Sequence, residues 1–268
     1  MAVHDDAQSR ADKKTLTIII SVVSLVVVAV TITVAVILMN GVRAEQTPPA
    51  AQSPSASSAT STDSASLFGD YADGRPIIIS HKGVGQADDS LPTVTEYFDH
   101  SCPGCVQLAT AADADLIAGA QAGDYNLAFA AVASHNAAWN PIATAASVLV
   151  AKETPDQWVA FHEALIAYYY AAMRSGDGTT VTDTDASLEQ VRIIAEKAAV
   201  PASVIETFPV AQVGQEYLNA SSLKWQESMA EGRTKLSTPE LVVNATHVEL
   251  VDYRSQTVMS EIRRLIGR

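Results

Sequence analysis

The two cysteines of the chain lie three positions apart, in the segment Cys102-Pro103-Gly104-Cys105. A β-branched and aromatic run, Thr93–Phe98, precedes them and a helical pattern follows, so the pair is predicted to lie where a strand becomes a helix. Pro103 suits the first helical position, because its fixed φ matches a helix and its missing N–H would have no intrahelical partner. The segment therefore predicts a β-α-β unit with both thiols at the start of its helix.

A helix start predicts different roles for the two thiols. Unpaired N–H groups of the first turn and the helix dipole favour negative charge, so a thiolate at Cys102 is stabilised, and we expect Cys102 to be an exposed nucleophile. Cys105 lies on the apolar stripe of the helix and should point inward, as the thiol that attacks a mixed disulfide at Cys102. The other members of this stripe are Leu108, Ala109, Ala112 and Leu116. The pattern favours a dithiol that cycles between reduced and oxidised forms.

Three other interpretations of the pair stay open. A zinc site needs about four ligands, and His100 is the one histidine near the cysteines. A structural disulfide would close a very short loop and so stabilise little. An inert buried pair conflicts with the expected exposure of Cys102. The remaining histidines form no ligand cluster along the sequence: His4, His81, His135, His162 and His247. Redox exchange at the pair requires no metal and no bound cofactor.

The N-terminal part predicts a membrane anchor. Residues 15–39 are almost wholly apolar and uncharged, long enough for a helix to cross a bilayer. Three cations, Arg10, Lys13 and Lys14, precede this segment and Arg43 follows it, so residues 1–14 are expected in the cytoplasm and the rest of the chain outside. A cleavable signal peptide is the alternative, although the apolar stretch is longer than a usual signal core.

Composition divides the remainder into a linker and a folded domain. Residues 45–66 consist mainly of Ala, Ser, Thr, Pro and Gln, which bury too little apolar surface to fold alone, so a disordered linker is predicted over residues 40–70. Residues 71–268 have the length of one domain with a large insertion. The net charge of −13 lies beyond the anchor, because acids and bases of the first fourteen residues cancel. Nucleic acids and anionic lipids are therefore unsuitable partners.

Periodicity predicts strands first, helices in the middle and strands again near the end. The expected strands are Pro76–Ser80, Thr93–Phe98, Asn126–Val132, Glu240–Val243 and His247–Val251, the last two joined through Asn244 and Ala245. The expected helices after the cysteine helix are Pro141–Lys152, Pro155–Ala172, Ser187–Ala199 and Pro209–Glu231. A final helix carries the stripe Val258, Ile262, Leu265 and Ile266. The fold class is α/β, with a helical insertion at about residues 137–232.

This arrangement resembles the thioredoxin fold, and the chain is similar to membrane-anchored DsbA-type thiol-disulfide oxidoreductases over most of residues 76–268. The segment from Glu96 to Cys105 carries the resemblance, together with Ser237-Thr238-Pro239 ahead of a strand. The resemblance implies a cis proline at Pro239 packed against the dithiol, with the backbone of Thr238 offered to a substrate strand. The best-known family motif has histidine where this chain has Gly104, which predicts a milder oxidant.

Two further residues are candidates for tuning the dithiol. Glu96 shares a strand face with Val94 and Phe98 and is expected to point into the core, where burial raises the pKa of a carboxyl group. Such an acid could accept and return the proton of Cys105, and the family places an acid at the matching position; a solvated edge glutamate is the alternative. His100, when protonated, could stabilise the Cys102 thiolate, or it could be a loop histidine with no catalytic part.

These features predict an enzyme, an extracytoplasmic thiol-disulfide oxidoreductase that passes a Cys102-Cys105 disulfide to free thiols of exported proteins. The resemblance implies a membrane oxidase of the DsbB or vitamin K epoxide reductase type as the partner that reoxidises it. Two alternatives stay open. One is a thiol reductase on the same fold, for example in cytochrome maturation. The other is a surface binding module whose cysteine pair is inert.

Overall fold

The computed structural model describes residues 64–209 and 211–268. The predicted cytoplasmic tail, the anchor at residues 15–39 and most of the predicted linker lie outside the described residues. Among the helices of the described part, none is both long and apolar enough to cross a membrane.

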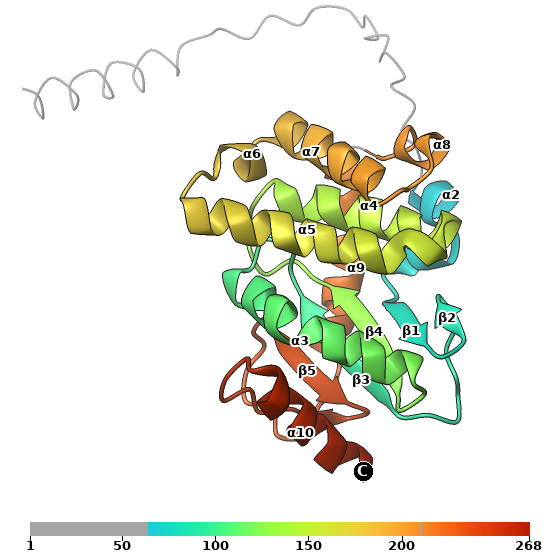
Figure 1. Ribbon diagram of the computed structural model, residues 1–268, viewed down its shortest axis with the longest axis vertical. Coiled ribbons are helices and arrows are strands. Elements are labelled where there is room, and N and C mark those ends of the chain that lie inside the picture. Colours follow the sequence, from blue (N-terminus) through green and yellow to red (C-terminus); the bar gives the residue numbers. More distant parts are fainter. Residues whose placement is uncertain (1–63, 210) are drawn as a thin grey trace, which may run out of the picture. The chain divides into compact units, whose positions relative to one another are not determined.

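A six-stranded mixed sheet forms the centre of the domain, in the order β2-β1-β4-β3-β5-β6 (Figure 1). Strands β3 and β4 run parallel, whereas β1 is antiparallel to β4 and β5 is antiparallel to β3. The strands are β1 (Ile77–Ser80), β2 (Gly83–Val84), β3 (Thr93–Phe98), β4 (Asn126–Ala131), β5 (Glu240–Val243) and β6 (Thr246–His247). The parallel β3-α3-β4 unit at the centre is the one that the sequence predicted around the cysteines.

Helices cover both faces of the sheet. Helix α3 (Pro103–Gln121) and helix α10 (Ser255–Ile266) pack together on one face, and α9 (Ala211–Glu227) lies behind the sheet in Figure 1. The alternation of β3 explains this arrangement. Val94, Glu96 and Phe98 are buried on one face, while the ring of Tyr97 stacks on Trp225 of α9 on the other, with centroids 5.8 Å apart.

A helical block follows β4 and corresponds to the predicted insertion. Helix α4 packs against α5, α7 and α9, and α5 also contacts α3, so the block rests on the helix that carries the cysteines. The helices of the block before α9 are α4 (Trp139–Glu153), α5 (Pro155–Ser175), α6 (Thr179–Thr182), α7 (Thr184–Lys197) and α8 (Ala202–Ile205). The apolar face of α5 turns into the block, with Trp158, Phe161 and Leu165 fully buried and Tyr169 partly buried.

Several predicted boundaries are wrong. The last strand ends at His247 rather than Val251, since the chain leaves the sheet after Val248, whose N–H donates to the Leu241 carbonyl, and Val251 is 71% exposed. Helix α9 ends at Glu227 rather than Glu231. The segment after it instead turns toward β5, where Arg233 pairs with a buried glutamate.

The folded part also begins earlier than residue 71. Helix α2 (Ser64–Phe68) and the 3-10 helix η1 (Gly69–Asp73) lie within the range predicted as linker up to residue 70. Phe68 is fully buried, and its ring makes an edge contact with Tyr217 of α9. Burial of the Phe68 side chain helps to order these turns. The average composition of the preceding polar tract does not reveal this contribution of a single residue.

Candidate active site

The cysteine pair lies at the junction that the sequence predicted. Cys102 is the N-cap residue of α3 with extended backbone angles, and Pro103 occupies the first turn. The backbone N–H of Cys105 donates to the Cys102 sulfur across 3.2 Å, which satisfies one of the unpaired donors of the helix start. Both cysteines are free thiols in this structure. The stripe of α3 that carries Cys105 is buried, as expected.

The expectation that Cys102 is exposed is wrong, because the residue is only 2% exposed. The loop before β5 covers it: the carbonyl oxygen of Thr238 lies 3.6 Å from the Cys102 sulfur. A Cβ atom added at Gly104 would lie 3.1 Å from Pro239 Cδ and 3.2 Å from the Tyr253 hydroxyl. Since Pro103 is exposed and the covering residues Thr238, Pro239 and Tyr253 are only partly buried, the sulfur lies beneath a single layer of side chains.

The Thr238-Pro239 peptide bond is cis, in agreement with what the family resemblance implies. The next residue, Glu240, is buried and accepts hydrogen bonds from Arg233 at 2.6 and 3.0 Å and from the Trp225 indole at 2.6 Å. His247 Nδ1 lies 3.0 Å from the same carboxylate. This anchor holds the proline loop over the dithiol. The sequence carries no signal for this role of Glu240, because an acid that opens a short strand usually faces solvent.

The two thiols differ strongly in acidity. Hydrogen bonding by the Cys105 thiol, followed by that of the Thr238 side chain and the Cys105 backbone, lowers the pKa of Cys102 to about 6 against the opposing effect of burial. Burial raises the pKa of Cys105 well above its usual value, and the neighbouring Cys102 raises it further. This asymmetry suits an attacking thiol at Cys102 and a protonated partner at Cys105.

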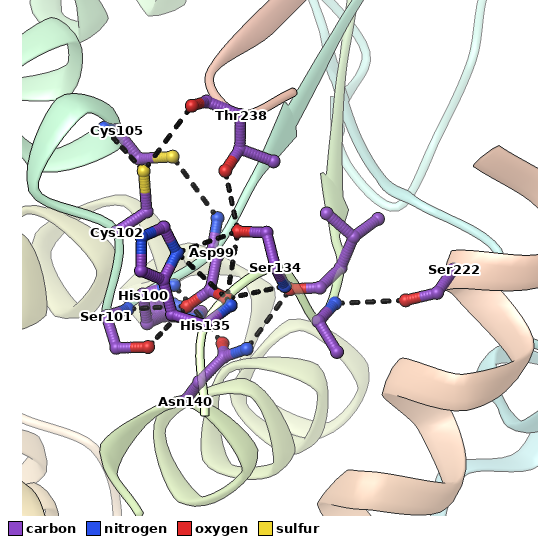
Figure 2. A network of polar contacts seen from close by, with 12 residues as sticks. Asp99, His100, Ser101, Cys102, Cys105, Ser134, His135, Asn140, Ser222 and Thr238 are labelled. Carbon is purple, nitrogen blue, oxygen red and sulfur yellow. Dashed lines mark hydrogen bonds and ion pairs between the residues drawn. The ribbon is translucent and has the colours of Figure 1, made fainter. Parts of the chain in front are cut away.

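A fully buried carboxylate, Asp99, organises the loops around the dithiol (Figure 2). Its Oδ1 accepts hydrogen bonds from the backbone and hydroxyl of Ser101, at 2.7 and 2.6 Å. Its Oδ2 accepts from the backbone N–H groups of Ser134 and His135, both at 2.8 Å, and from the Ser134 hydroxyl at 3.1 Å. Asp99 therefore ties the loop after β3 to the loop after β4. Asp99 lies within the segment from Glu96 to Cys105 that carries the family resemblance, but its role depends on a partner loop that the sequence does not locate.

His100 cannot act as the cation proposed for it. Its ring is buried, with Nδ1 3.0 Å from the Thr144 hydroxyl, and its backbone N–H donates to Asn140. Burial, reinforced by the nearby His162, lowers the pKa of His100 to about 3. The histidine whose charge acts on Cys102 is instead His135, from the loop after β4. That residue lies 33 positions from Cys102 in the sequence, which is why it looked like a scattered histidine.

Glu96 points into the core, as its strand alternation predicted, and is 1% exposed. Burial raises the pKa of Glu96 well above its usual value, and the carboxylate of Asp113 raises it further. Asp113, on α3, is itself paired with His162 of α5, whose Nε2 lies 3.0 Å away. One oxygen of Glu96 has no hydrogen-bond partner. A neutral, protonated Glu96 therefore lies under the dithiol helix, and the alternative of a solvated edge glutamate is wrong.

In residues 64–209 and 211–268, no three His, Cys, Asp or Glu side chains are grouped so as to hold a metal ion. The geometry instead brings Cys102, Cys105, Thr238 and Pro239 together, with Glu96 buried on the adjoining strand face. The two tyrosines beside Cys102, Tyr169 and Tyr253, both have a raised pKa, chiefly because of burial, and remain neutral neighbours. The site can carry out exchange between sulfur atoms with its own side chains.

No protein-family model and no curated protein sequence matches the chain. Solved structures do match. The MdbA protein of Actinomyces oris, a thiol-disulfide oxidoreductase, is 20% identical with a TM-score of 0.57, covering 71% of this chain and 87% of that one. Reduced DsbA of Mycobacterium tuberculosis (19%, TM-score 0.52) and oxidised BdbD of Bacillus subtilis (19%, TM-score 0.51) each cover 73% of this chain and 94% of their own. The described part of the chain therefore has the thioredoxin-like fold of these DsbA-type proteins.

Proposed function

We propose that the chain is a thiol-disulfide oxidoreductase that passes a Cys102-Cys105 disulfide to thiols of exported proteins. The observation that carries this proposal is the unequal acidity of the two thiols beside a cis-proline loop. A pKa of about 6 is typical of a reactive thiol and is not expected in an inert cysteine pair. The same observation weighs against a binding module whose cysteines play no chemical part.

The exchange balances in two steps. A substrate thiolate attacks the Cys102 sulfur of the enzyme disulfide, which forms a mixed disulfide and releases Cys105 as a thiolate that takes up a proton. A second substrate thiolate then attacks the substrate sulfur of the mixed disulfide and releases Cys102 as a thiolate. Two substrate thiols are oxidised to a disulfide, and the enzyme disulfide is reduced to a dithiol. Stabilisation of the Cys102 thiolate favours this direction, because that thiolate is the final leaving group.

Substrate is expected to bind along the proline loop. Pro239 has no N–H, and the backbone of Thr238 lies beside the Cys102 sulfur, so an extended peptide can pair with Thr238 by strand addition and bring its own sulfur to the site. The covering layer of Thr238, Pro239 and Tyr253 opens as the peptide enters.

The acidity of Cys102 predicts the strength of the enzyme as an oxidant. Its pKa of about 6 lies between the values of about 7 for thioredoxin and about 3.5 for DsbA. We therefore expect a reduction potential between roughly −270 and −120 mV, the values of those two proteins. This fits the milder oxidant predicted from Gly104. A reductase on the same fold would keep its dithiol reduced in the cell, and thiol trapping of the resident protein distinguishes the two directions.

The proposal includes a membrane tether and a reoxidising partner. Residues 15–39 supply the apolar segment, with residues 1–14, which carry Arg10, Lys13 and Lys14, on the cytoplasmic side and a linker that holds the domain outside. An enzyme that has passed on its disulfide is left as a dithiol and needs an electron acceptor to be reoxidised. The family resemblance points to a membrane oxidase of the DsbB or vitamin K epoxide reductase type.

Cys102→Ser is the direct test. The full-length protein, purified in detergent, is expected to oxidise a dithiol peptide, and the variant should lose this activity completely. Alkylation of the reduced protein should follow a titration near pH 6, because the thiolate reacts and the thiol does not. That titration should vanish in the variant. Activity that survives in Cys102→Ser, or a wild-type titration near the ordinary thiol pKa, would contradict the proposal.

Glu96→Gln tests the buried acid. In the wild type, protonated Glu96 supplies the proton that Cys105 takes up when it leaves and receives it back when Cys105 attacks, and proton transfer of this kind contributes about 10²-fold or more to rate. We expect the reduction step to slow by at least about tenfold in the variant, measured by stopped-flow fluorescence of the enzyme with a dithiol peptide.

The same substitution has a pH-dependent effect on stability. The pKa of Glu96 is raised on folding, so its contribution is fully present below the unfolded-state pKa and is lost as pH rises toward the folded pKa. Glu96→Gln removes this loss and should be more stable than the wild type at pH 8, with a smaller difference at pH 4, in urea unfolding. A variant that is less stable at pH 8 would show that Glu96 is ionised and paired.

A further inference from the structure

Thr238 makes two different contacts at the edge of the dithiol. Its carbonyl oxygen lies 3.6 Å from the Cys102 sulfur, and its hydroxyl lies 2.6 Å from the hydroxyl of Ser134, in the loop after β4. Figure 2 shows both contacts, with the carbonyl turned toward Cys102 and the hydroxyl toward Ser134. The group that fixes the Thr238 side chain is therefore separate from the backbone group that borders the nucleophile.

The Ser134 hydroxyl has all of its hydrogen-bonding positions filled. It donates its proton to Asp99 Oδ2 across 3.1 Å, so in its contact with Thr238 the Thr238 hydroxyl is the donor. His135 Nδ1, 3.0 Å from the Ser134 oxygen, fills the second acceptor position. One donor and two acceptor positions are all that a hydroxyl offers. The orientation of the Ser134 hydroxyl, and with it that of the Thr238 side chain, is thereby fixed.

The loop that carries Ser134 is fastened along its backbone. Three successive N–H groups donate to side chains of other segments: Ala133 to Ser222 of α9 at 2.9 Å, and Ser134 and His135 to Asp99, both at 2.8 Å. Asp99 and Ser222 are both buried. A loop held in this way does not follow a movement of its neighbours, so it is a fixed point for the side chain that it binds.

The proline loop lacks support from packing on one side. After Pro239, the buried Glu240 anchors the chain to the turn that follows α9. Before it, residues 234–237 are all exposed, so their packing contributes little to the position of Thr238. The contact with Ser134 supplies an anchor on that side.

We propose that Ser134, held by Asp99, positions the substrate-binding edge: it keeps the backbone of Thr238 in the orientation with which an incoming peptide strand pairs. The inference rests on the function proposed above and names the residue that sets the geometry of peptide recognition. The partner that fits this edge is an extended polypeptide with free backbone N–H and C=O groups, whereas a small thiol needs only the sulfur. Ser134 acts through Thr238 and is therefore a positioning residue.

The test compares two reductants of the oxidised full-length protein in detergent: a dithiol peptide, and dithiothreitol, which has no peptide backbone. Stopped-flow fluorescence gives a second-order rate constant for each. Ser134→Ala should lower the ratio of the peptide constant to the dithiothreitol constant by at least about threefold, the size expected for one hydrogen bond. The dithiothreitol constant itself should stay at the wild-type value. Ser134→Thr keeps the hydroxyl and should restore the wild-type ratio.

Thr238→Val removes the same contact from its other end and should lower the ratio by a similar factor. Because the two hydroxyls act through each other, Ser134→Ala/Thr238→Val should fall no further than either single variant. The ratio cancels any change that Thr238→Val makes in the reactivity of the Cys102 sulfur, since both reductants attack that sulfur.

Ser90→Ala is the matched control, because the hydroxyl and backbone N–H of Ser90 also donate to one carboxylate, that of Asp88, but in the turn that precedes β3. Its ratio should equal that of the wild type.

The proposal is overturned if Ser134→Ala leaves the ratio unchanged, if both rate constants fall together, or if Ser134→Thr fails to restore the ratio. It is also overturned if the double variant loses the product of the two single effects. In each of these cases, a wild type that oxidises the peptide through Cys102 retains the proposed function. A wild type that oxidises neither reductant would overturn both.

Discussion

Cys105→Ser is expected to convert the protein into a trap for its substrates. The variant keeps Cys102, its N-cap position and the backbone N–H of residue 105 that donates to the sulfur. It lacks the thiol that resolves a mixed disulfide. Once Cys102 attacks a disulfide of an exported protein, the mixed disulfide can break only by return of the released substrate thiol, so it should outlast that of the wild type. Turnover should fall by about 10³-fold or more, as for removal of a catalytic group that acts as part of a unit.

The measurement is non-reducing electrophoresis after acid quenching of cells that express the variant. Adducts should appear as bands that collapse to the free protein on reduction. The double variant Cys102→Ser/Cys105→Ser is the control and should form no adducts. The double variant has no cysteine left, because the chain contains only two. Adducts in the double variant would therefore show that the bands do not arise from exchange at this site. A single variant without adducts would instead show that Cys102 does not attack substrate disulfides.

Comparison of Cys105→Ser with Cys105→Ala tests the hydrogen bond between the two thiols. Hydrogen bonding by the Cys105 thiol is the largest influence that lowers the pKa of Cys102. A serine hydroxyl can donate in the same way, so Cys105→Ser should keep much of the acidity of Cys102, whereas Cys105→Ala should raise its pKa further. Trapping should therefore be faster in the serine variant at pH 6 than in the alanine variant.

Local sequence patterns predicted the elements that carry the dithiol. The strand before the cysteines and the proline at the start of α3 follow from β propensity, helix capping and φ restriction, each of which acts over a few residues. The inward direction of Glu96 follows from strand alternation alone. The cis bond before Pro239 required the family resemblance, because a Thr-Pro pair ahead of a strand is ordinarily trans.

Features that depend on contacts between distant segments were missed or predicted wrongly. Cys102 was expected to be exposed because a helix start usually is, but the cover comes from a loop 136 positions away in the sequence. His135 and Ser134 contact Asp99, and Ser134 also contacts Thr238, because β4 runs parallel to β3, which brings the ends of both strands to the same edge of the sheet. A parallel β-α-β prediction could have directed attention to the residues after β4 as well as to those after β3.

Arg233→Ala is expected to destabilise the protein strongly and to disturb the proline loop. The Arg233 side chain is 9% exposed and makes two hydrogen bonds to Glu240, which is 1% exposed. It also donates to the Ser228 carbonyl and so fixes the turn after α9. Removing one partner of a buried ion pair leaves an uncompensated charge and costs about 3–5 kcal/mol. We expect a loss near the lower end, about 3 kcal/mol, because Trp225 and His247 still contact the carboxylate.

Urea unfolding and peptide oxidation together check this expectation. Glu240 follows Pro239 directly, so loss of its anchor should lower peptide oxidation per folded molecule, as well as the free energy of unfolding. Arg254→Ala is the matched control, since Arg254 also donates from Nε and Nη2 to a carboxylate, that of Asp252, but is largely exposed, and its unfolding curve should overlay that of the wild type. Equal effects of the two substitutions would show that burial of the Arg233-Glu240 pair does not position the proline loop. If Arg233→Ala is strongly destabilised but its oxidation per folded molecule is unchanged, the Arg233-Glu240 pair contributes to stability alone. We expect slower oxidation instead, because the anchored loop keeps Thr238 beside the nucleophile.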